Sequence, residues 1–234
     1  MVKNIFIDFL SAVFFGKPYI SRILTNMAYQ KQRFYQKCGL DEAGRGAWAG
    51  PLVAAAVVLK CSVAKISRLA QTKIKDGKLL RPQQRQKIYQ ALKQAKAELV
   101  VEAISVRSIN NHGIGWANRE IFRRLIRKVV ADEYIVDGNL KIGRINSKTQ
   151  RIKSIVDADA TIPEVILAGI VAKVERDKIM RHLHSQFPGY KWFNNKGYGT
   201  KQHLRAIENS SDTYHHRHVF VATALRHHSK NYFY

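Results

Sequence analysis

The spacing of hydrophobic and polar residues divides the chain from residue 35 onward into short apolar runs and amphipathic stretches. Apolar runs of this length predict β-strands over 35–41, 53–59, 99–106, 133–137 and 153–156. A Gly-rich segment joins the first two runs, and such a connection is typical of an antiparallel pair.

Amphipathic stretches predict helices between and after these strands. Apolar residues recur with helical spacing over 82–96, 116–130, 163–183, 200–208 and 219–228. The outer face of the second of these helices is basic and carries Arg119, Arg123, Arg124, Arg127 and Lys128. Strands that alternate with helices indicate an α/β protein.

Composition adds a large positive charge to this picture. The 234 residues include 40 Lys and Arg against 17 Asp and Glu, which gives a formal net charge of +23, while 46% of the residues are hydrophobic. The hydrophobic share excludes general disorder, and the length allows one large domain or one with a small appendage. The charge favours a polyanion as a lasting partner, with an anionic membrane surface as the alternative.

The first 26 residues differ from the rest of the chain. An apolar patch over 5–15 is too short to span a bilayer, and no small-residue cleavage site follows it. We predict that residues 1–26 form an extension that is either poorly ordered or not translated. A catalytic domain over 27–185 and a helical C-terminal region over 186–234 would follow.

Cys38 and Cys61 show no metal-ligand spacing and do not suggest a disulfide scaffold. They indicate a reducing compartment, although both flank the predicted hairpin and a bridge between them stays open.

Acidic residues stand at the ends of the predicted strands. Asp41 and Glu42 end the first strand, Asp137 ends the fourth, and Asp159 lies just before a predicted helix. Neighbouring strand residues point to opposite faces, so Asp41 and Glu42 would share one site only if the chain turns there, as the glycines after them permit. Strand ends in an α/β sheet form the ligand crevice.

Four carboxylates that converge in this way would need cations between them, and their hard oxygen atoms suit Mg²⁺ or Mn²⁺. This arrangement points to phosphoryl chemistry. The alternative is that Asp41 and Glu42 form a solvated turn and that Asp137 merely terminates a strand.

Several segments in consistent order resemble the ribonuclease HII, or type 2 ribonuclease H, family. They extend over about 36–228 and comprise residues 38–58, 136–139, 158–164, 172–177, 195–200 and 215–217. The resemblance implies a ribonuclease H-like fold: a mixed five-stranded sheet with flanking helices and a small helical C-terminal region. The Gly-Arg-Gly loop and a fourth Asp fit this family better than the related ribonuclease HIII.

The resemblance also implies a site for two metal ions, Mn²⁺ or Mg²⁺. The position of Asp41 bridges the two ions in the family, Glu42 and Asp137 help to hold the ion on the leaving-group side, and Asp159 serves the ion that orients the attacking water. Asp157 lies two residues before Asp159, and the alignment favours Asp159 as the ligand.

Substrate contacts are implied for residues outside the carboxylate set. In the family, backbone groups of the Gly-Arg-Gly loop grip the 2′-hydroxyl that distinguishes RNA from DNA, and the tyrosine that matches Tyr198 packs on the following sugar. The alternative for Tyr198 is a half-buried core residue. The predicted substrate-binding residues are Gly44, Arg45, Gly46, Lys78, Lys173 and Tyr198.

Three departures from the family pattern affect residues near these contacts. Gly77 and Gly169 replace usual serines, and His218 with Val219 stands where Arg-Ser is common. We expect these changes to affect the grip on substrate rather than the metal ligands. The C-terminal histidines either contact phosphate or are solvated, with the solvated state favoured and no spacing that supports zinc; they are His215, His216, His218, His227 and His228.

The implied activity is metal-dependent endonucleolytic hydrolysis of the RNA strand in RNA–DNA hybrids and at single ribonucleotides embedded in duplex DNA. This reaction would leave a 3′-hydroxyl and a 5′-phosphate and would serve to remove misincorporated ribonucleotides. We expect the protein to be a cytoplasmic monomer with no membrane partner. Two rivals remain: a non-catalytic basic nucleic-acid-binding protein, and a recombinase or transposase nuclease with the same fold.

Overall fold

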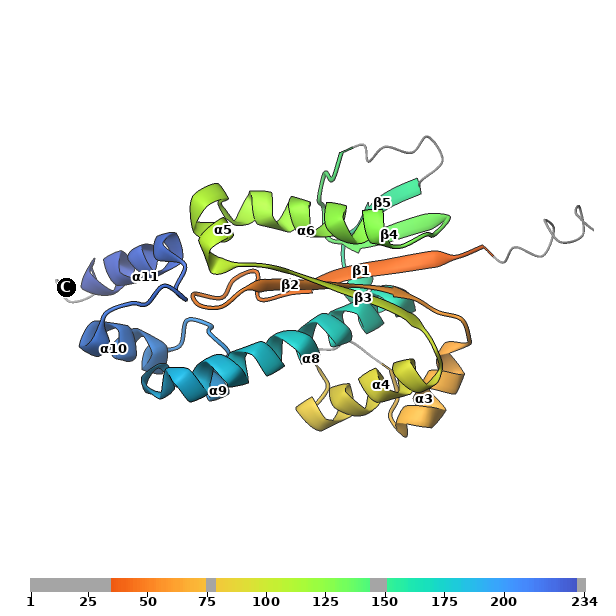
Figure 1. Cartoon of the computed structure of the whole chain (residues 1–234), viewed down its shortest axis with the longest axis horizontal. Coiled ribbons are helices and arrows are strands. Elements are labelled where there is room, and N and C mark those ends of the chain that lie inside the picture. The colour runs from red at the N-terminus through yellow and green to blue at the C-terminus, as the bar shows by residue number, and fades with distance from the viewer. Residues whose placement is uncertain (1–34, 75–78, 144–150, 231–234) are drawn as a thin grey trace, which may run out of the picture. The chain divides into compact units, whose positions relative to one another are not determined.

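A mixed sheet of five strands forms the centre of the protein. The computed structural model describes residues 35–74, 79–143 and 151–230. The strand order is β3-β2-β1-β4-β5 (Figure 1), with antiparallel pairs β3/β2 and β2/β1 and parallel pairs β1/β4 and β4/β5. The mixed five-stranded sheet predicted from the sequence is therefore confirmed. The strands are β1 (Lys37–Ala43), β2 (Leu52–Val58), β3 (Glu98–Ile104), β4 (Glu133–Asp137) and β5 (Arg151–Ile155).

Helices cover both faces of this sheet (Figure 1). One face packs against α6 (Ile114–Lys128), and the other packs against the long α8 (Pro163–Gln186), beside which α4 (Pro82–Gln94) lies. Every residue of β2 is buried because its alternate side chains enter the two cores. Burial on both faces explains why β2 is apolar throughout rather than alternating.

Several short helices were not predicted from the sequence, and two of them carry a clear local signal. They are α3 (Val63–Ala70) and α5 (Val106–His112). Each begins at a serine whose hydroxyl accepts a backbone N–H from the first turn: Ser62 from Lys65, and Ser105 from Ser108. These serine caps were the signal that hydrophobic spacing alone did not use.

The C-terminal part of the chain is helical, as predicted, and packs on the end of α8. Trp192 is fully buried there among Met180, Tyr190 and Ile207. The elements of this part are the 3-10 helix η2 (Pro188–Tyr190), α9 (Trp192–Asn195), α10 (Lys201–Ser210) and α11 (His218–Lys230).

Residues Gln36–Tyr234 group into one compact unit. The predicted boundary between 185 and 186 falls at the C-terminal end of α8 and stays a prediction, and the predicted extension over 1–26 lies outside the described residues. Within the described part of the chain, no helix is both long and apolar enough to cross a membrane.

The two cysteines are free and lie on different faces of the sheet. Cys38 packs in the core under α6, whereas Cys61 contacts the core under α8. The sheet between them explains why no bridge forms across the hairpin.

Candidate active site

The central strand β1 extends past the end of its parallel neighbour. The pairing of β1 with β4 ends at Leu40 and Val136, whereas its pairing with β2 continues to Ala43. Asp41 and Glu42 therefore stay within the strand, and the expectation that they could share one site only through a turn is wrong. Because β4 no longer pairs with the strand at this point, side chains that leave β1 in different directions can both border the space beyond β4.

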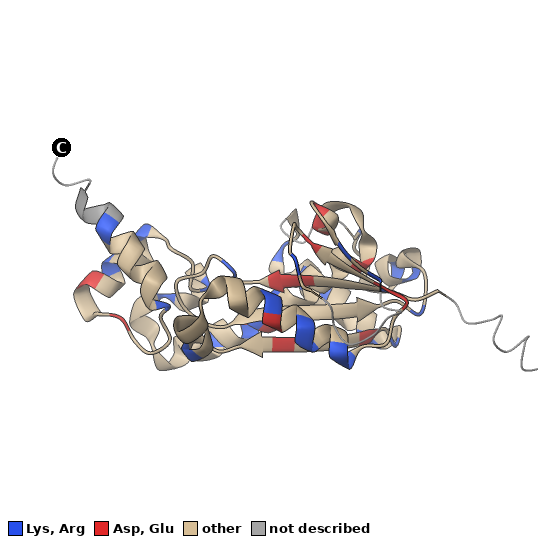
Figure 2. Ribbon diagram, turned by 90° about the horizontal axis from the view of Figure 1, so that it is seen from above, with Lys and Arg blue, Asp and Glu red and all other residues tan. Residues whose placement is uncertain are grey.

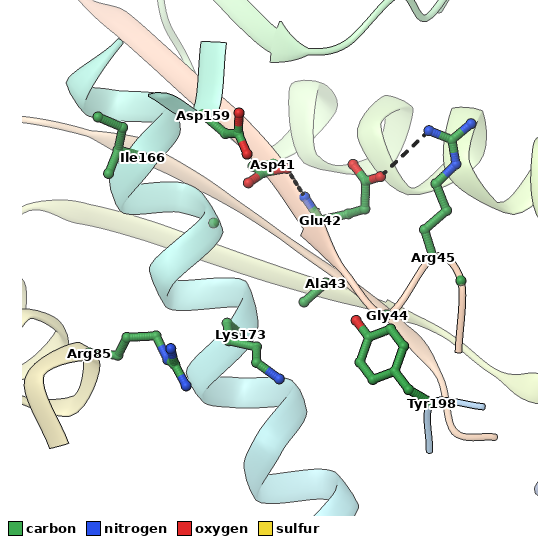
Figure 3. Close-up of a pocket in the computed structure, with 12 residues that line it drawn as sticks. Asp41, Glu42, Ala43, Gly44, Arg45, Arg85, Asp159, Ile166, Lys173 and Tyr198 are labelled. Carbon is green, nitrogen blue, oxygen red and sulfur yellow. Dashed lines mark hydrogen bonds and ion pairs between the residues drawn. The ribbon is translucent and has the colours of Figure 1, made fainter. Parts of the chain in front are cut away.

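A pocket of about 350 Å³ opens at this place (Figure 3). The side chain of Asp159, from the short helix α7 (Ala158–Thr161), points toward Asp41 in the same view. The lining residues are Asp41, Glu42, Ala43, Gly44, Arg45, Gly46, Arg85, Asp159, Ile166, Gly169, Lys173 and Tyr198.

Most of the residues predicted from the sequence thus meet in one pocket, but two require comment. Asp137 does not line the pocket; its Oδ1 accepts the backbone N–H of Asp159 at 3.1 Å, which places it beside that residue. Lys78 lies outside the described residues. Asp157, the rejected alternative to Asp159, is exposed and does not line the pocket. Sequence reasoning missed Arg85 and Ile166 as lining residues.

Burial and mutual repulsion disfavour ionisation of the two strand carboxylates. Burial raises the pKa of Asp41 well above its usual range, and the charges of Glu42, Asp137 and Asp159 add to this. Burial likewise raises the pKa of Glu42 to about 7, although the Arg45 guanidinium, 4.0 Å away, acts in the opposite direction. A bound cation would relieve this repulsion.

The donor set fits a hard divalent cation by its chemistry, because all four acids offer carboxylate oxygens. No three His, Cys, Asp or Glu side chains in the described ranges are already arranged to hold a metal ion. Binding would therefore require the carboxylates to adjust.

Gly169 gives the Asp41 carboxylate its place against α8. A Cβ at residue 169 would lie 2.2 Å from Asp41 Oδ2, so any other side chain would displace the carboxylate. The carboxylate also accepts the backbone N–H of Glu42 at 2.7 Å. The expectation that the Gly169 departure affects only the grip on substrate is wrong, because this position contacts a predicted metal ligand.

Two buried arginines hold the loop that follows β1, a role that sequence reasoning did not assign. Arg176 donates to the carbonyls of Ala49, Pro51 and Lys196, and Arg217 donates to those of Gly50 and Arg45; the N–O distances are 2.8–3.1 Å. Both side chains are fully buried.

These two arginines, the arginine clamp, require glycine at position 44. Gly44 has φ +91°, and a Cβ there would lie 1.9 Å from Nε of Arg176. Burial and the neighbouring Arg176 lower the pKa of Arg217 to about 9. The loop therefore rests on two positive charges whose partners are backbone carbonyl dipoles.

Tyr198 forms the wall of the pocket opposite the carboxylates (Figure 3). Its side chain is 37% exposed, and the ring centroid lies 5.3 Å from Arg176 Cζ and 5.8 Å from Lys173 Nζ. Lys173 also pairs with Asp177 at 2.7 Å. These positions suit substrate contact, and the roles of both residues stay predictions.

The C-terminal histidines do not share one environment. His216 is fully buried, so its predicted solvated state is wrong, whereas His218 is exposed and its Nδ1 lies 3.0 Å from Asp212. The side chains of His227 and His228 lie outside the described residues.

The basic face of α6 is partly neutralised. Lys and Arg lie along this helix in Figure 2, and Arg119 and Arg127 are exposed there. Arg124 and Lys128 form ion pairs with glutamates, and Arg123 donates to a backbone carbonyl. Fewer of the five cations than the sequence suggests are thus ready to contact phosphate.

A family model described as Ribonuclease HII matches residues 38–223. Ribonuclease HII of Wolbachia pipientis subsp. Culex pipiens is 38% identical over 185 residues, which cover 78% of this chain and 89% of the relative. Ribonuclease HII of Aliarcobacter butzleri is 33% identical over 190 residues, which cover 80% of this chain and 92% of the relative.

Solved structures confirm the predicted ribonuclease H-like fold. Ribonuclease H2 from Pyrococcus horikoshii matches with a TM-score of 0.64 at 22% identity and covers 80% of this chain and 96% of its own. Bst-RNase HIII in complex with Mn²⁺ matches with a TM-score of 0.60 at 16% identity and covers 82% of this chain and 70% of its own. At these identities the two structures establish the fold alone.

Glu42→Gln should stabilise the metal-free protein at pH 8. When folding raises the pKa of a carboxyl group, the folded protein loses stability as the pH rises from the unfolded to the folded pKa of that group. For Glu42 this range runs from 4.5 to about 7. The gain should be about 1–3 kcal/mol in the free energy of unfolding at pH 8 and should vanish near pH 4. Urea denaturation with a chelator measures it, with Glu120→Gln on α6 as the control. Equal stability of wild type and Glu42→Gln at pH 8 would contradict the argument.

Gly169→Ala should make the protein depend more on metal. Alanine within a helix normally adds about 1 kcal/mol, but here the Cβ pushes the Asp41 carboxylate off α8 and into the pocket, toward the other acids. We expect no stability gain in chelator and a larger rise in Tm on adding Mn²⁺ than in wild type. Gly115→Ala is the matched control, since its Cβ would meet nothing closer than 3.8 Å. Identical behaviour of the two variants would disprove the contact.

Proposed function

The chain belongs to the ribonuclease HII family and is an endoribonuclease of the ribonuclease H type, and we propose that it cuts at single ribonucleotides embedded in duplex DNA as well as in the RNA strand of RNA–DNA hybrids. The products would carry a 3′-hydroxyl and a 5′-phosphate, and the role would be the removal of misincorporated ribonucleotides. The observation that carries the proposal is the pocket in which strand carboxylates face a glycine loop and an exposed tyrosine.

The four carboxylates are proposed as the catalytic and metal-binding groups: Asp41, Glu42, Asp137 and Asp159. A pair of Mn²⁺ or Mg²⁺ ions held by them would supply positive charge at the attacking and leaving oxygens of the scissile phosphodiester. The raised pKa values of Asp41 and Glu42 support this assignment, because burial and the neighbouring carboxylates disfavour both negative charges and Arg45 only partly offsets this at Glu42. The complex of Bst-RNase HIII with Mn²⁺ supports the choice of metal.

The loop over Gly44, Arg45 and Gly46 is proposed to recognise the 2′-hydroxyl through its backbone. The clamp by Arg176 and Arg217 fixes this loop from inside the protein. At Gly46 an added Cβ would meet nothing within 4 Å, so the backbone is open to an approaching sugar. A backbone reader needs such access, since side chains would hold the ribose away.

Lys173 and Tyr198, on the other wall of the pocket, are proposed to contact the nucleic-acid strand. Lys78 stays a predicted phosphate contact. The net charge of +23 supports association with a duplex, because neutralising phosphates releases counterions. A cytoplasmic location and a monomeric state belong to the same proposal.

One assay separates this proposal from its rivals. Labelled duplexes with zero, one or many ribonucleotides are incubated with and without Mg²⁺ or Mn²⁺. We expect metal-dependent cleavage of the last two only. Binding without metal-dependent cleavage would favour a non-catalytic protein, and cleavage of all-DNA duplex would favour a recombinase or transposase nuclease.

Asp41→Asn should abolish this cleavage while duplex binding without metal persists or tightens, because one carboxylate that faces the phosphates is gone. Binding is measured by fluorescence anisotropy and cleavage on the same labelled strand. Near-normal turnover of Asp41→Asn would overturn the site assignment.

Tyr198→Ala should reduce cleavage at a single embedded ribonucleotide more than cleavage of a long hybrid, in which neighbouring contacts align the strand. The expected loss is about 1–3 kcal/mol, the scale of one aromatic stack, and Tyr198→Phe should lose less. Single-turnover rates on the two substrates measure the ratio, with the exposed Tyr35→Ala as control. An equal fall in both cleavage rates would contradict the prediction and indicate that Tyr198 has a purely structural role.

A further inference from the structure

Behind Tyr198, two buried histidines that are 13 residues apart in the chain meet directly. His203 lies in α10 and His216 in the segment before α11, and both are fully buried. Their Nε2 atoms are 3.1 Å apart. Neither side chain lines the pocket, and the activity proposed above uses neither of them.

The tautomer of His203 is fixed because one hydrogen-bond partner can only donate and the other can only accept. The indole N–H of Trp192 can only donate, and it lies 3.1 Å from His203 Nε2, which must therefore accept. In a neutral imidazole the proton is then on Nδ1, which lies 3.0 Å from the carbonyl oxygen of Tyr198. That oxygen can only accept, so His203 donates to the backbone of Tyr198.

His216 is fixed in the opposite tautomer. The backbone N–H of Thr213 donates to His216 Nδ1 at 2.9 Å, so Nδ1 is the acceptor and the proton is on Nε2. This Nε2–H points at Nε2 of His203. All the bonds thus run one way, from Thr213 through the two rings to the carbonyl of Tyr198.

Both rings must stay uncharged for this arrangement to hold. A second proton on His203 would place its Nε2–H against the Nε2–H of His216 across the 3.1 Å contact. A second proton on His216 would place its Nδ1–H against the backbone N–H of Thr213, 2.9 Å away. Burial lowers the pKa of His203, and burial together with His203 lowers the pKa of His216 to about 4. The environment of the pair therefore agrees with the tautomers that the hydrogen bonds require.

We propose that the His203–His216 pair is a positioning device that sets the backbone at Tyr198 and thereby the place of its ring in the pocket. The inference rests on the proposed function, because it gives Tyr198 the task of meeting the sugar. The ring is 37% exposed, so packing holds it less firmly than a core residue. The carbonyl of Tyr198 also accepts the N–H of Thr200 at 3.0 Å, and His203 supplies its second donor.

The tautomers are tested directly by ¹⁵N NMR on protein with labelled histidine. At neutral pH we expect His203 to carry its proton on Nδ1 and His216 to carry its proton on Nε2, with assignments from His203→Asn and His216→Asn. A charged ring, or the proton of His203 on Nε2, would overturn the inference.

The positioning role is tested by a matched pair of substitutions. His203→Asn keeps an N–H near the place of Nδ1, whereas His203→Leu removes it. We expect His203→Leu to lower the ratio of single-ribonucleotide to long-hybrid cleavage roughly three- to tenfold, the range for loss of one hydrogen bond, and His203→Asn to restore most of it. Ile207→Ala, a buried change in the same helix, is the control for destabilisation and should leave the ratio unchanged.

A shift of the Tyr198 ring resonance in ¹³C-tyrosine spectra of His203→Leu, but not of Ile207→Ala, would support positioning independently of activity. If Tyr198→Ala changes the cleavage ratio and His203→Leu does not, the positioning inference fails while the proposed function stands. If Tyr198→Ala leaves the ratio unchanged although the ring resonance shifts, the proposed role of Tyr198 fails instead.

Discussion

Repulsion between carboxylates fixed at the end of a buried strand is the constraint around which the rest of the site is built. Asp41 and Glu42 are placed by the register of β1 with β2, so the sheet itself prevents them from moving apart. What surrounds them reduces the cost: Gly169 leaves room for one carboxylate, a backbone N–H binds it, and Arg45 faces the other. Asp41 and Glu42 are both only partly exposed, so these few contacts carry more weight than they would at the surface.

The loop after β1 lies between the carboxylates of the pocket and two buried positive charges. Arg176 and Arg217 bind backbone carbonyl oxygens from inside, and within the described part of the chain their hydrogen bonds go to no carboxylate. Buried guanidinium groups need several acceptors to offset their desolvation, and a backbone turn can present several at once. The same bonds that satisfy the arginines therefore fix the loop proposed to read the sugar.

Sequence reasoning found the strands, the mixed sheet and most pocket residues because these depend on local spacing and on segments that resemble a known family. It required a turn for Asp41 and Glu42 to share one site, because local spacing does not show that β4 stops pairing with β1 at Val136. The Gly169 contact, the arginine clamp and the histidine pair join residues 13 to 172 positions apart in the chain. Such contacts depend on how helix faces are oriented against the sheet, which hydrophobic periodicity does not specify.

The long helix α8 connects all these parts along one side. Gly169, Lys173, Arg176 and Met180 recur at intervals of three or four residues, so they follow one face past Asp41, Tyr198, the loop and the C-terminal core. The 24 residues of α8 span about 36 Å. Inserting or deleting one residue between Gly169 and Met180 would rotate one end of that face by about 100° against the other. The number of residues in α8 over this stretch is thus as constrained as the identities of Gly169 and Arg176.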